Sequence, residues 1–266
     1  MEQMNLDDEQ WGFSDEARDE LEADPLTASM SVAEAHKKRA DREEWADYVM
    51  EDMGQLGDGT LNVRFRRWLI EADRSLQEDM LTLIDRDRRG MFVFFDSVIQ
   101  LVDGRISQLW GPGPGGINLH TLGAFAQALG LYLLTASDEP TVVLAAERGA
   151  RDLPSCRVVA EVLASQGVVT YLSPEGLGVD AVTELVGEKR VDLGVCLSEA
   201  ENGMRGPVVV VDCEGEPLCQ SACDCVNRAL QEIDVFDDVR RFDLRKALRE
   251  ELVIPLGGVA KAENGQ

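Results

Sequence analysis

Residues 141–172 read TVVLAAERGARDLPSCRVVAEVLASQGVVTYL, and this stretch decides the fold. Thr141–Ala145 and Val168–Leu172 are nearly continuous apolar runs rich in Val, which is typical of strands buried on both faces. Between them, Pro154–Gln166 carries apolar residues at helical spacing and has a proline in its first turn. A strand, a helix and a strand in this order predict two parallel strands joined by a helical crossover.

The same alternation continues on both sides of this stretch. We expect helices at Leu119–Thr135, Val179–Val186 and Leu218–Ile233, and strands at Leu193–Leu197 and Val208–Val211. Only the ten residues 198–207 separate the last two strands, which is too few for a helical crossover, so these strands should pair antiparallel. The sequence therefore predicts an α/β fold with three layers, α/β/α, around a mixed, mostly parallel sheet.

The region before this module is predicted to be α-helical. Ser31–Met53 opens on a Ser-x-x-Glu capping box, and Leu61–Arg88 carries apolar residues at three- and four-residue spacing. Gly90 is expected to end the second helix. Two amphipathic helices in series could form a hairpin that packs on the module or binds another chain.

Other segments are predicted from their local composition. Met91–Phe95 and Val98–Val102 look extended, because they are rich in β-branched and aromatic residues. Residues 236–254 predict an amphipathic helix that Pro255 would close.

Charge and composition divide the chain into four regions. Residues 1–30 are acidic and are expected to be largely disordered, because the first sixty residues carry 18 acids against 5 bases and few aliphatic side chains. Residues 31–90 form the helical region and residues 91–235 the α/β module. Residues 236–266 form a C-terminal helix and tail.

Length, charge and hydropathy exclude several classes of function. The chain has 266 residues, of which 44% are hydrophobic, and a formal net charge of −24. Such an acidic chain does not fit nucleic-acid binding, which needs clustered Lys and Arg. No apolar run approaches the ~20 residues that span a bilayer, and the first residues lack the features of a signal peptide. We therefore expect a cytoplasmic protein that binds neither nucleic acid nor membrane.

The cysteines suggest no metal site. Four of the six lie within thirteen residues, at Cys213, Cys219, Cys223 and Cys225. Their spacing, C-x5-C-x3-C-x-C, matches no common zinc pattern. We expect small buried hydrophobic residues in a reducing compartment rather than metal ligands, and no cofactor.

The histidines and the glycine-rich segment give no catalytic motif. His36 lies near the acidic N-terminal region, and His120 is expected to be a polar residue at the start of a helix. Gly111–Gly116, which reads GPGPGG, lacks the terminal Lys-Ser/Thr of a phosphate-binding P-loop. We expect this segment to be a connecting loop.

Several short motifs nevertheless follow one another in a distinctive order. They are Val102–Ile106 (VDGRI), Gln127–Gly130 (QALG), Val142–Gly149 (VVLAAERG), Leu163–Val168 (LASQGV), Cys196–Val209 (CLSEAENGMRGPVV) and Glu214–Leu218 (EGEPL). In order and spacing, over about residues 95–235, they resemble domain 1 of the α-D-phosphohexomutases, the family of phosphoglucomutases and phosphomannomutases.

The resemblance implies roles for four residues. Ser198 stands at the position of the family's phosphoserine, and Arg105, Arg151 and Arg205 are the cations available to bind a phosphate group. The chain departs from the family after the serine, where His-Asn-Pro is replaced by Glu199-Ala-Glu201. Carboxylates next to a phosphoserine repel it.

A second departure concerns the family's other domains. Its metal-binding and sugar-binding loops belong to domains for which we expect no room in these 266 residues. Phosphoryl transfer depends on such metal and cationic charge. Mg²⁺ is therefore expected only if a partner protein supplies the missing metal loop.

These observations leave two main hypotheses. The leading one is a non-catalytic module that acts as a scaffold or regulatory subunit by binding another protein, since a fold does not fix a function. The alternative is a sugar-phosphate phosphotransferase that forms part of a split enzyme, or a protein that binds a sugar phosphate in carbohydrate metabolism. A generic nucleotide-binding domain is less favoured, because no Gly-x-Gly-x-x-Gly motif follows a strand.

Two apolar stripes are candidates for the partner-binding surface. The first comprises Phe65, Trp68, Leu69 and Leu76, and the second comprises Val239, Phe242 and Leu248. The alternative for both stripes is packing within the chain itself.

Overall fold

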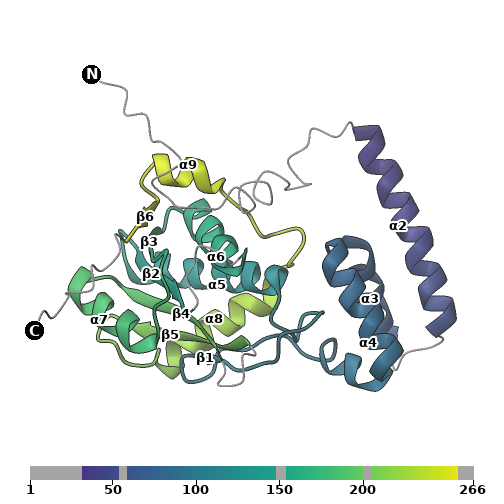
Figure 1. Cartoon of the computed structure of the whole chain (residues 1–266), viewed down its shortest axis with the longest axis horizontal. Coiled ribbons are helices and arrows are strands. Elements are labelled where there is room, and N and C mark those ends of the chain that lie inside the picture. The colour runs from purple at the N-terminus through teal and green to yellow at the C-terminus, as the bar shows by residue number, and fades with distance from the viewer. Residues whose placement is uncertain (1–31, 54–58, 148–153, 200–204, 257–266) are drawn as a thin grey trace, which may run out of the picture.

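The computed structural model describes residues 32–53, 59–147, 154–199 and 205–256. A helical unit, formed by α2, α3 and α4, lies beside an α/β module that holds the sheet and the remaining helices (Figure 1).

A six-stranded mixed sheet forms the centre of the α/β module. Its strands are β1 (Arg105–Ile106), β2 (Thr141–Ala146), β3 (Val169–Leu172), β4 (Leu193–Glu199), β5 (Arg205–Asp212) and β6 (Val253–Pro255). They are arranged in the order β1-β5-β4-β2-β3-β6. The neighbours β4–β2, β2–β3 and β3–β6 are parallel, whereas β5 is antiparallel to both β4 and β1. The predicted antiparallel pairing of β4 and β5 is confirmed.

Helices cover both faces of this sheet, which confirms the predicted three layers. One face packs against α5 (Leu119–Ala136), α6 (Pro154–Ser165) and α8 (Gln220–Glu232), and the other packs against α7 (Val179–Lys189). Side chains alternate along β5, so that Val208 and Val210 enter the first core while Val209 and Val211 enter the second. The central parts of β2, β4 and β5 are apolar because both of their faces are covered.

In the described part of the chain, α5 is long and apolar enough to cross a membrane. This helix is the core helix of the module. Of its 18 residues, 56% are buried within the protein, against the sheet and the flanking helices.

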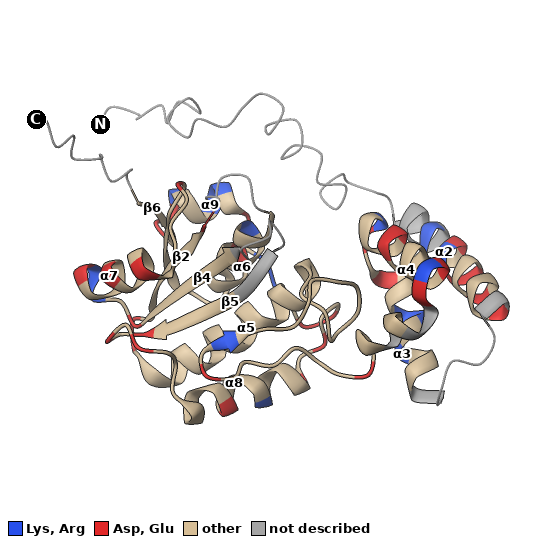
Figure 2. Ribbon diagram, turned by 60° about the horizontal axis from the view of Figure 1, so that its bottom comes forward, with Lys and Arg blue, Asp and Glu red and all other residues tan. Residues whose placement is uncertain are grey.

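The helical unit contains three helices rather than two. They are α2 (Val32–Met53), α3 (Gly59–Glu71) and α4 (Arg74–Val93), and charged residues of both signs lie along α2 (Figure 2). The predicted single helix over Leu61–Arg88 is therefore wrong. It breaks at Asp73, whose carboxylate accepts a hydrogen bond from the backbone N–H of Leu76 and so begins a new helix.

The predicted end of this helix is also wrong. Gly90 does not stop α4, which continues to Val93 through a non-helical residue at Asp87. Met91–Phe95 is consequently not a strand, and Val98–Val102 has only an isolated pairing of Val102 with Arg105. Met91 and Phe95 are buried in the core of the helical unit. The apolar and aromatic composition of this stretch therefore reflects burial in that core and not a strand.

The C-terminal segment differs from its predicted helix over 236–254. Only α9 (Leu244–Arg249) is helical, and Pro255 lies in β6, which adds to the edge of the sheet beside β3. A proline is tolerated there because the outer side of an edge strand needs no donor. The apolar positions that suggested one long helix still pack on the α/β core, Leu244 and Leu248 from α9 and Val239, Phe242 and Leu252 from irregular chain.

Trp68 of α3 joins the helical unit to the α/β module. Its side chain is 3% exposed and packs edge-on against Phe95, His120 and Phe236, with ring centroids 6.2, 5.8 and 5.0 Å away. His120 lies in the first turn of α5, and Phe236 follows α8. Edge-to-face ring contacts add to the free energy of burying the aromatic surface.

Arg67 reinforces this contact with charge. Its guanidinium binds the carboxylate of Asp234, lies 2.9 Å from an oxygen of Asp237, and is 5.6 Å from the centroid of the Phe236 ring. A paired guanidinium that also covers an aromatic ring fixes both partners in one orientation. The residues on the two sides of this contact are more than 160 positions apart in sequence.

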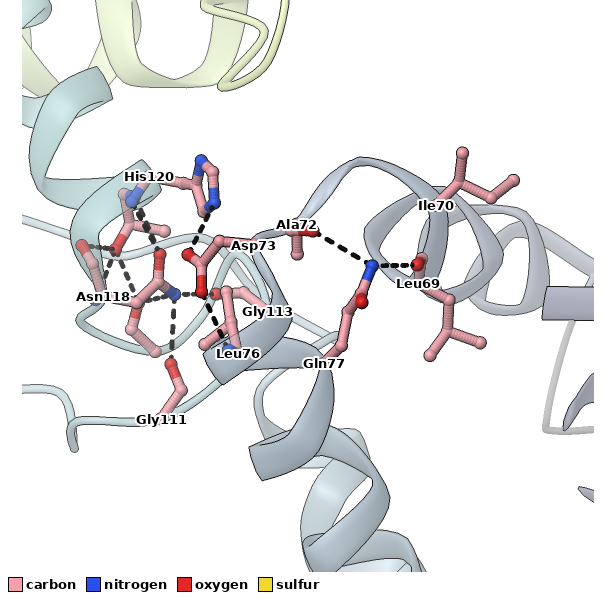
Figure 3. A network of polar contacts seen from close by, with 12 residues as sticks. Leu69, Ile70, Ala72, Asp73, Leu76, Gln77, Gly111, Gly113, Asn118 and His120 are labelled. Carbon is pink, nitrogen blue, oxygen red and sulfur yellow. Dashed lines mark hydrogen bonds and ion pairs between the residues drawn. The ribbon is translucent and has the colours of Figure 1, made fainter. Parts of the chain in front are cut away.

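Asn118 holds the glycine-rich loop against the start of α5 (Figure 3). Its side-chain oxygen accepts hydrogen bonds from the backbone N–H groups of His120 and Thr121, both at 3.0 Å. Its side-chain amide donates to the carbonyls of Gly111, at 3.1 Å, and Gly113, at 2.9 Å. The loop therefore directs carbonyls inward, which agrees with its not being a phosphate-binding P-loop.

The loop needs glycine because other parts of the chain approach it closely. Gly113 has φ +85°, and a Cβ on it would lie 2.5 Å from the carbonyl oxygen of Phe94. On Gly116 a Cβ would lie 2.3 Å from the carbonyl oxygen of Gly111. These distances exclude a larger side chain at either position without a shift of the backbone.

We predict that Asn118→Ala destabilises the protein by about 3 kcal/mol. The substitution removes the cap of α5 and takes the side-chain amide donor away from the carbonyls of Gly111 and Gly113. Urea unfolding followed by circular dichroism measures the change. Gln100→Ala, at an exposed amide, serves as the control and should alter the free energy of unfolding by less than about 0.5 kcal/mol. Equal effects of the two substitutions would contradict the role given to Asn118.

Asp73 contributes to stability through its charge. His120 Nε2 lies 3.4 Å from Asp73 Oδ2, and this contact holds the pKa of the Asp73 carboxyl below its ordinary value. A carboxyl with a lowered pKa in the folded state stabilises the protein above its unfolded pKa of about 4, and the contribution is lost as pH falls through the folded value.

We predict that Asp73→Asn lowers the free energy of unfolding at pH 6 by about 0.5 kcal/mol, because the half-exposed pair is screened by solvent. Asn keeps the capping ability, so the substitution tests the charge. The difference from wild type should shrink as pH falls from about 5 towards 2. Asp79→Asn, on the exposed side of α4, is the matched control and should show no such pH dependence.

Candidate functional site

The candidate site lies at the edge of the sheet where the parallel strands end. β2, β3 and β4 all end at this edge, and in open α/β sheets ligands bind outside the carboxyl ends of the strands. Ser198 lies near the end of β4 and is half-buried. The structure thus places the predicted serine where the fold can present a side chain to a ligand.

Glu147 is the direct neighbour of Ser198 on the adjacent strand. Ala146 of β2 pairs with Leu197 of β4, and the backbone N–H of Glu147 donates to the Leu197 carbonyl at 3.1 Å. The next residues along the two parallel strands are Glu147 and Ser198. The alternation of side chains places both on the sheet face that α7 covers.

The Glu147 carboxylate also lies near the N-terminus of α7. A Cβ on Gly178, the N-cap of α7, would be 3.9 Å from Glu147 Oε1. Because the N-cap is a glycine, it has no side chain of its own with which to cap the helix. The exposed N–H groups and dipole of a helix N-terminus favour an anion. Glu147 thus places an anionic group of the chain itself at a position that an anionic ligand would use.

Burial and charge both change the pKa of Cys196, which lies two residues before Ser198 on the same face of β4. Burial, and after it the nearby charge of Glu147, raises the pKa of the Cys196 thiol to about 12. The thiol contacts the Leu177 carbonyl at 3.5 Å. Cys196 is therefore an inert, protonated side chain beneath the site rather than a nucleophile.

Of the three predicted phosphate-binding arginines, the structure describes the side chain of Arg105 alone. Arg105 in β1 pairs with Val209, which in turn pairs with Cys196, so it lies on the same sheet face as Ser198 with β5 between. The strands β1 and β4 are therefore two strand spacings apart, which is about 10 Å. Arg151 lies outside the described residues. Arg205 begins β5 opposite Glu199, and only its backbone is described.

The groups described at this edge are hydroxyls and carboxylates. Ser173, at the end of β3, is 3% exposed, and its hydroxyl donates to the Glu175 carbonyl at 3.0 Å. Over the ranges that the structure describes, no three His, Cys, Asp or Glu side chains are grouped so that they could hold a metal ion. Among the side chains that the structure describes here, the site can present the Ser198 hydroxyl to a partner and carries the negative charge of Glu147.

The cysteines divide into two groups. Cys156, Cys196 and Cys223 are buried, as expected for small hydrophobic residues, whereas Cys213, Cys219 and Cys225 are exposed. Burial raises the pKa of the Cys156 thiol to about 12. The hydroxyl of Ser221, 3.3 Å from Cys219 Sγ, and the backbone N–H groups at the start of α8 lower the pKa of Cys219.

The first predicted partner-binding stripe is covered by the chain itself. Phe65, Trp68, Leu69 and Leu76 are all less than 10% exposed and form the core of the helical unit with Phe95 and Met91. The second stripe, Val239, Phe242 and Leu248, is partly buried against the α/β core. The structure therefore offers neither stripe as an open apolar surface.

Sequence reasoning did not identify Glu147 or the contacts of His120. His120 does begin a helix as expected, but its pairing with Asp73 depends on the docking of the helical unit. Glu147 could have been found, because it directly follows a buried apolar strand that runs parallel to the strand of Ser198. The carboxyl ends of two such strands meet at one edge.

No known family model matches the sequence, and no curated protein matches it. Among solved structures, the chain is similar to a protein assigned as a phosphomannomutase from Thermus thermophilus, with 16% identity and a TM-score of 0.49 over 60% of this chain and 33% of that chain. It is also similar to the open form of pp63/parafusin, a phosphoglucomutase from Paramecium, with 12% identity and a TM-score of 0.37 over 43% of this chain and 23% of that chain. The chain thus spans a third or less of these proteins, and both TM-scores lie below 0.5, so neither similarity bears on activity.

We predict that Cys219 is the first of the six cysteines to react with iodoacetamide at about pH 7.5, because only the thiolate attacks. Cys156 and Cys196 should remain unmodified in the folded protein. Peptide mass spectrometry over a time course measures the order. Cys213 and Cys225 are exposed controls, and alkylation of either ahead of Cys219 would contradict the lowered pKa.

Proposed function

We propose that this chain is a non-catalytic, phosphohexomutase-like module that acts in the cytoplasm as a scaffold or regulatory subunit by binding another protein. The observation that supports the proposal best is Glu147. Glu147 directly follows β2, where its backbone lies next to the end of β4 that carries Ser198, and its carboxylate lies near the N-terminus of α7.

The charge of Glu147 opposes a phosphoserine at position 198. A phosphate monoester carries nearly two negative charges at neutral pH. Two like charges 4 Å apart repel by ~1 kcal/mol in water and ~4 kcal/mol at the effective dielectric near a protein surface. Glu199 and Glu201 add two carboxylates next to the serine in sequence. Catalysis of phosphoryl transfer needs positive charge at this place.

The position of Ser198 favours one alternative function. It lies at the carboxyl edge of the sheet, in the motif that resembles the family's phosphoserine loop, and Arg105 shares its sheet face. In that case the chain would be one part of a split phosphotransferase. A partner would then supply the Mg²⁺ loop and the cations that the described edge lacks.

The two functions predict different outcomes with glucose 1,6-bisphosphate and Mg²⁺. We predict that intact-mass spectrometry detects no gain of about 80 Da, the mass of a phosphoryl group, on the purified chain. Glu147→Gln keeps the shape of the side chain and removes its charge, so it tests whether repulsion is the obstacle. A gain in mass on the wild type that Ser198→Ala abolishes would establish phosphorylation at Ser198 and contradict the non-catalytic proposal.

Partner binding is tested with the full chain, because removing the helical unit would expose Phe95, His120 and Phe236. Tyr48 on α2 and Val63 on α3 are 72% and 71% exposed. We expect affinity purification from native lysate to recover one stoichiometric partner that Tyr48→Ser/Val63→Ser weakens. Leu131→Ser/Leu134→Ser, on the exposed side of α5, is the control. Recovery of a partner with mutase metal and sugar-binding domains would favour the split enzyme.

A further inference from the structure

Residues 240–249 form a basic segment in an acidic chain. Five of the ten are Arg or Lys and one, Asp243, is acidic, whereas the whole chain has a formal net charge of −24. All five basic side chains are exposed, and three of them lie on α9 (Figure 2). The Asp243 carboxylate accepts a hydrogen bond from the backbone N–H of Lys246 at 2.9 Å and caps the helix.

A buried carboxylate anchors the basic segment on α6. Glu161 is 3% exposed and accepts hydrogen bonds from Arg157 Nε and Arg241 Nε, both at 2.8 Å. The carbonyl of Glu161 also accepts a hydrogen bond from the backbone N–H of Phe242 at 2.9 Å. These contacts hold the chain in place without using the other four cations of the basic segment.

The remaining cations are only partly neutralised. Lys246 Nζ lies 3.7 Å from Glu250 and 4.8 Å from the centroid of the Phe242 ring. The guanidinium groups of Arg240, Arg245 and Arg249 form no ion pair with any carboxylate of the described residues. Arg249 donates to the carbonyl of Arg245 at 3.3 Å. The basic segment thus presents several cations together on a fixed support.

We propose that the acidic residues 1–31 of the same chain dock on the basic segment. Residues 1–31 carry ten Asp or Glu against one Arg, which complements the charge of the basic segment. The net negative charge of the protein repels a free polyanion in solution. An acidic segment of the same chain cannot diffuse away, because the tether keeps it near the basic segment at an effective concentration in the millimolar range.

The length of residues 1–31 sets the reach of the tether. A flexible chain of 31 residues has a root-mean-square span of about 30 Å and reaches about 100 Å when extended. Each exposed ion pair contributes little by itself, so the contact depends on several pairs and should weaken as salt screens them. The single Lys in the basic segment, Lys246, offers a specific chemical probe, since the chain has only five lysines.

Carbodiimide coupling of the full-length protein tests the proposal, because this reagent joins only amines and carboxylates that touch. We expect amide links between Lys246 and carboxylates of residues 1–31 at about 50 mM salt, reduced at least fivefold at about 500 mM salt. Links from Lys37 and Lys38 to residues 1–31 report that the reaction worked. A mixture of ¹⁵N-labelled and unlabelled protein distinguishes links within one chain from links between chains.

The matched variants reverse equal numbers of charges. Arg240→Glu/Arg245→Glu/Arg249→Glu should abolish the links from Lys246 while leaving Lys246 in place. Arg86→Glu/Arg190→Glu/Arg228→Glu changes three exposed arginines elsewhere and should leave the links unchanged. Links from Lys246 only to Glu250 or Glu251, links only between chains, or equal links in the two variants would each overturn the proposal.

Discussion

The hydrogen bonds of Asn118 are the constraint on which the two halves of the structure depend. One buried amide caps α5 and also collects carbonyls from the glycine-rich loop. The cap fixes where α5 begins, and so places His120 in its first turn, against Trp68 and near Asp73. The same loop packs on Phe94 and Phe95, which end the helical unit. A buried amide with both its donors and its acceptor in use specifies a single arrangement, because any displacement leaves polar groups unpaired.

The parallel strands impose the second constraint, at the carboxyl ends of β2 and β4. Parallel pairing in register brings the residue after β2 next to the last residues of β4, so the sequence at one strand end decides the electrostatics at the other. Here that residue is Glu147. A neutral or basic residue would leave the N-terminus of α7 and the Ser198 hydroxyl available to a phosphate group. The Glu147 carboxylate thus puts a negative charge at the edge where an open α/β sheet binds ligands, and such a side chain, rather than the fold, decides which chemistry the edge can support.

Much of the α/β module could be predicted from the sequence, because its elements are encoded locally. The apolar strands, the crossover helix and the short β4–β5 connection each carry their own pattern, and the structure confirms the three layers and the antiparallel pairing. The errors lie where distant residues decide. Asp73 divides one amphipathic pattern into two helices, and the apolar pattern of 236–254 packs on the core from irregular chain and the short helix α9. The spacing of apolar residues indicates which side chains are buried. Side chains can be buried against a distant part of the chain without forming the helix that their spacing suggests.

The same dependence on distant contacts decides how a partner could bind. The aromatic residues that looked like a docking stripe on isolated helices are the contacts that hold the helical unit to the α/β module. A partner that bound Trp68 would have to replace its packing against three rings and the neighbouring pairing of Arg67 with Asp234. Binding energy would then be spent on breaking the protein's own core. A partner that leaves this core intact must use polar or singly exposed apolar side chains, so its specificity would come from charge and shape rather than from a buried apolar stripe.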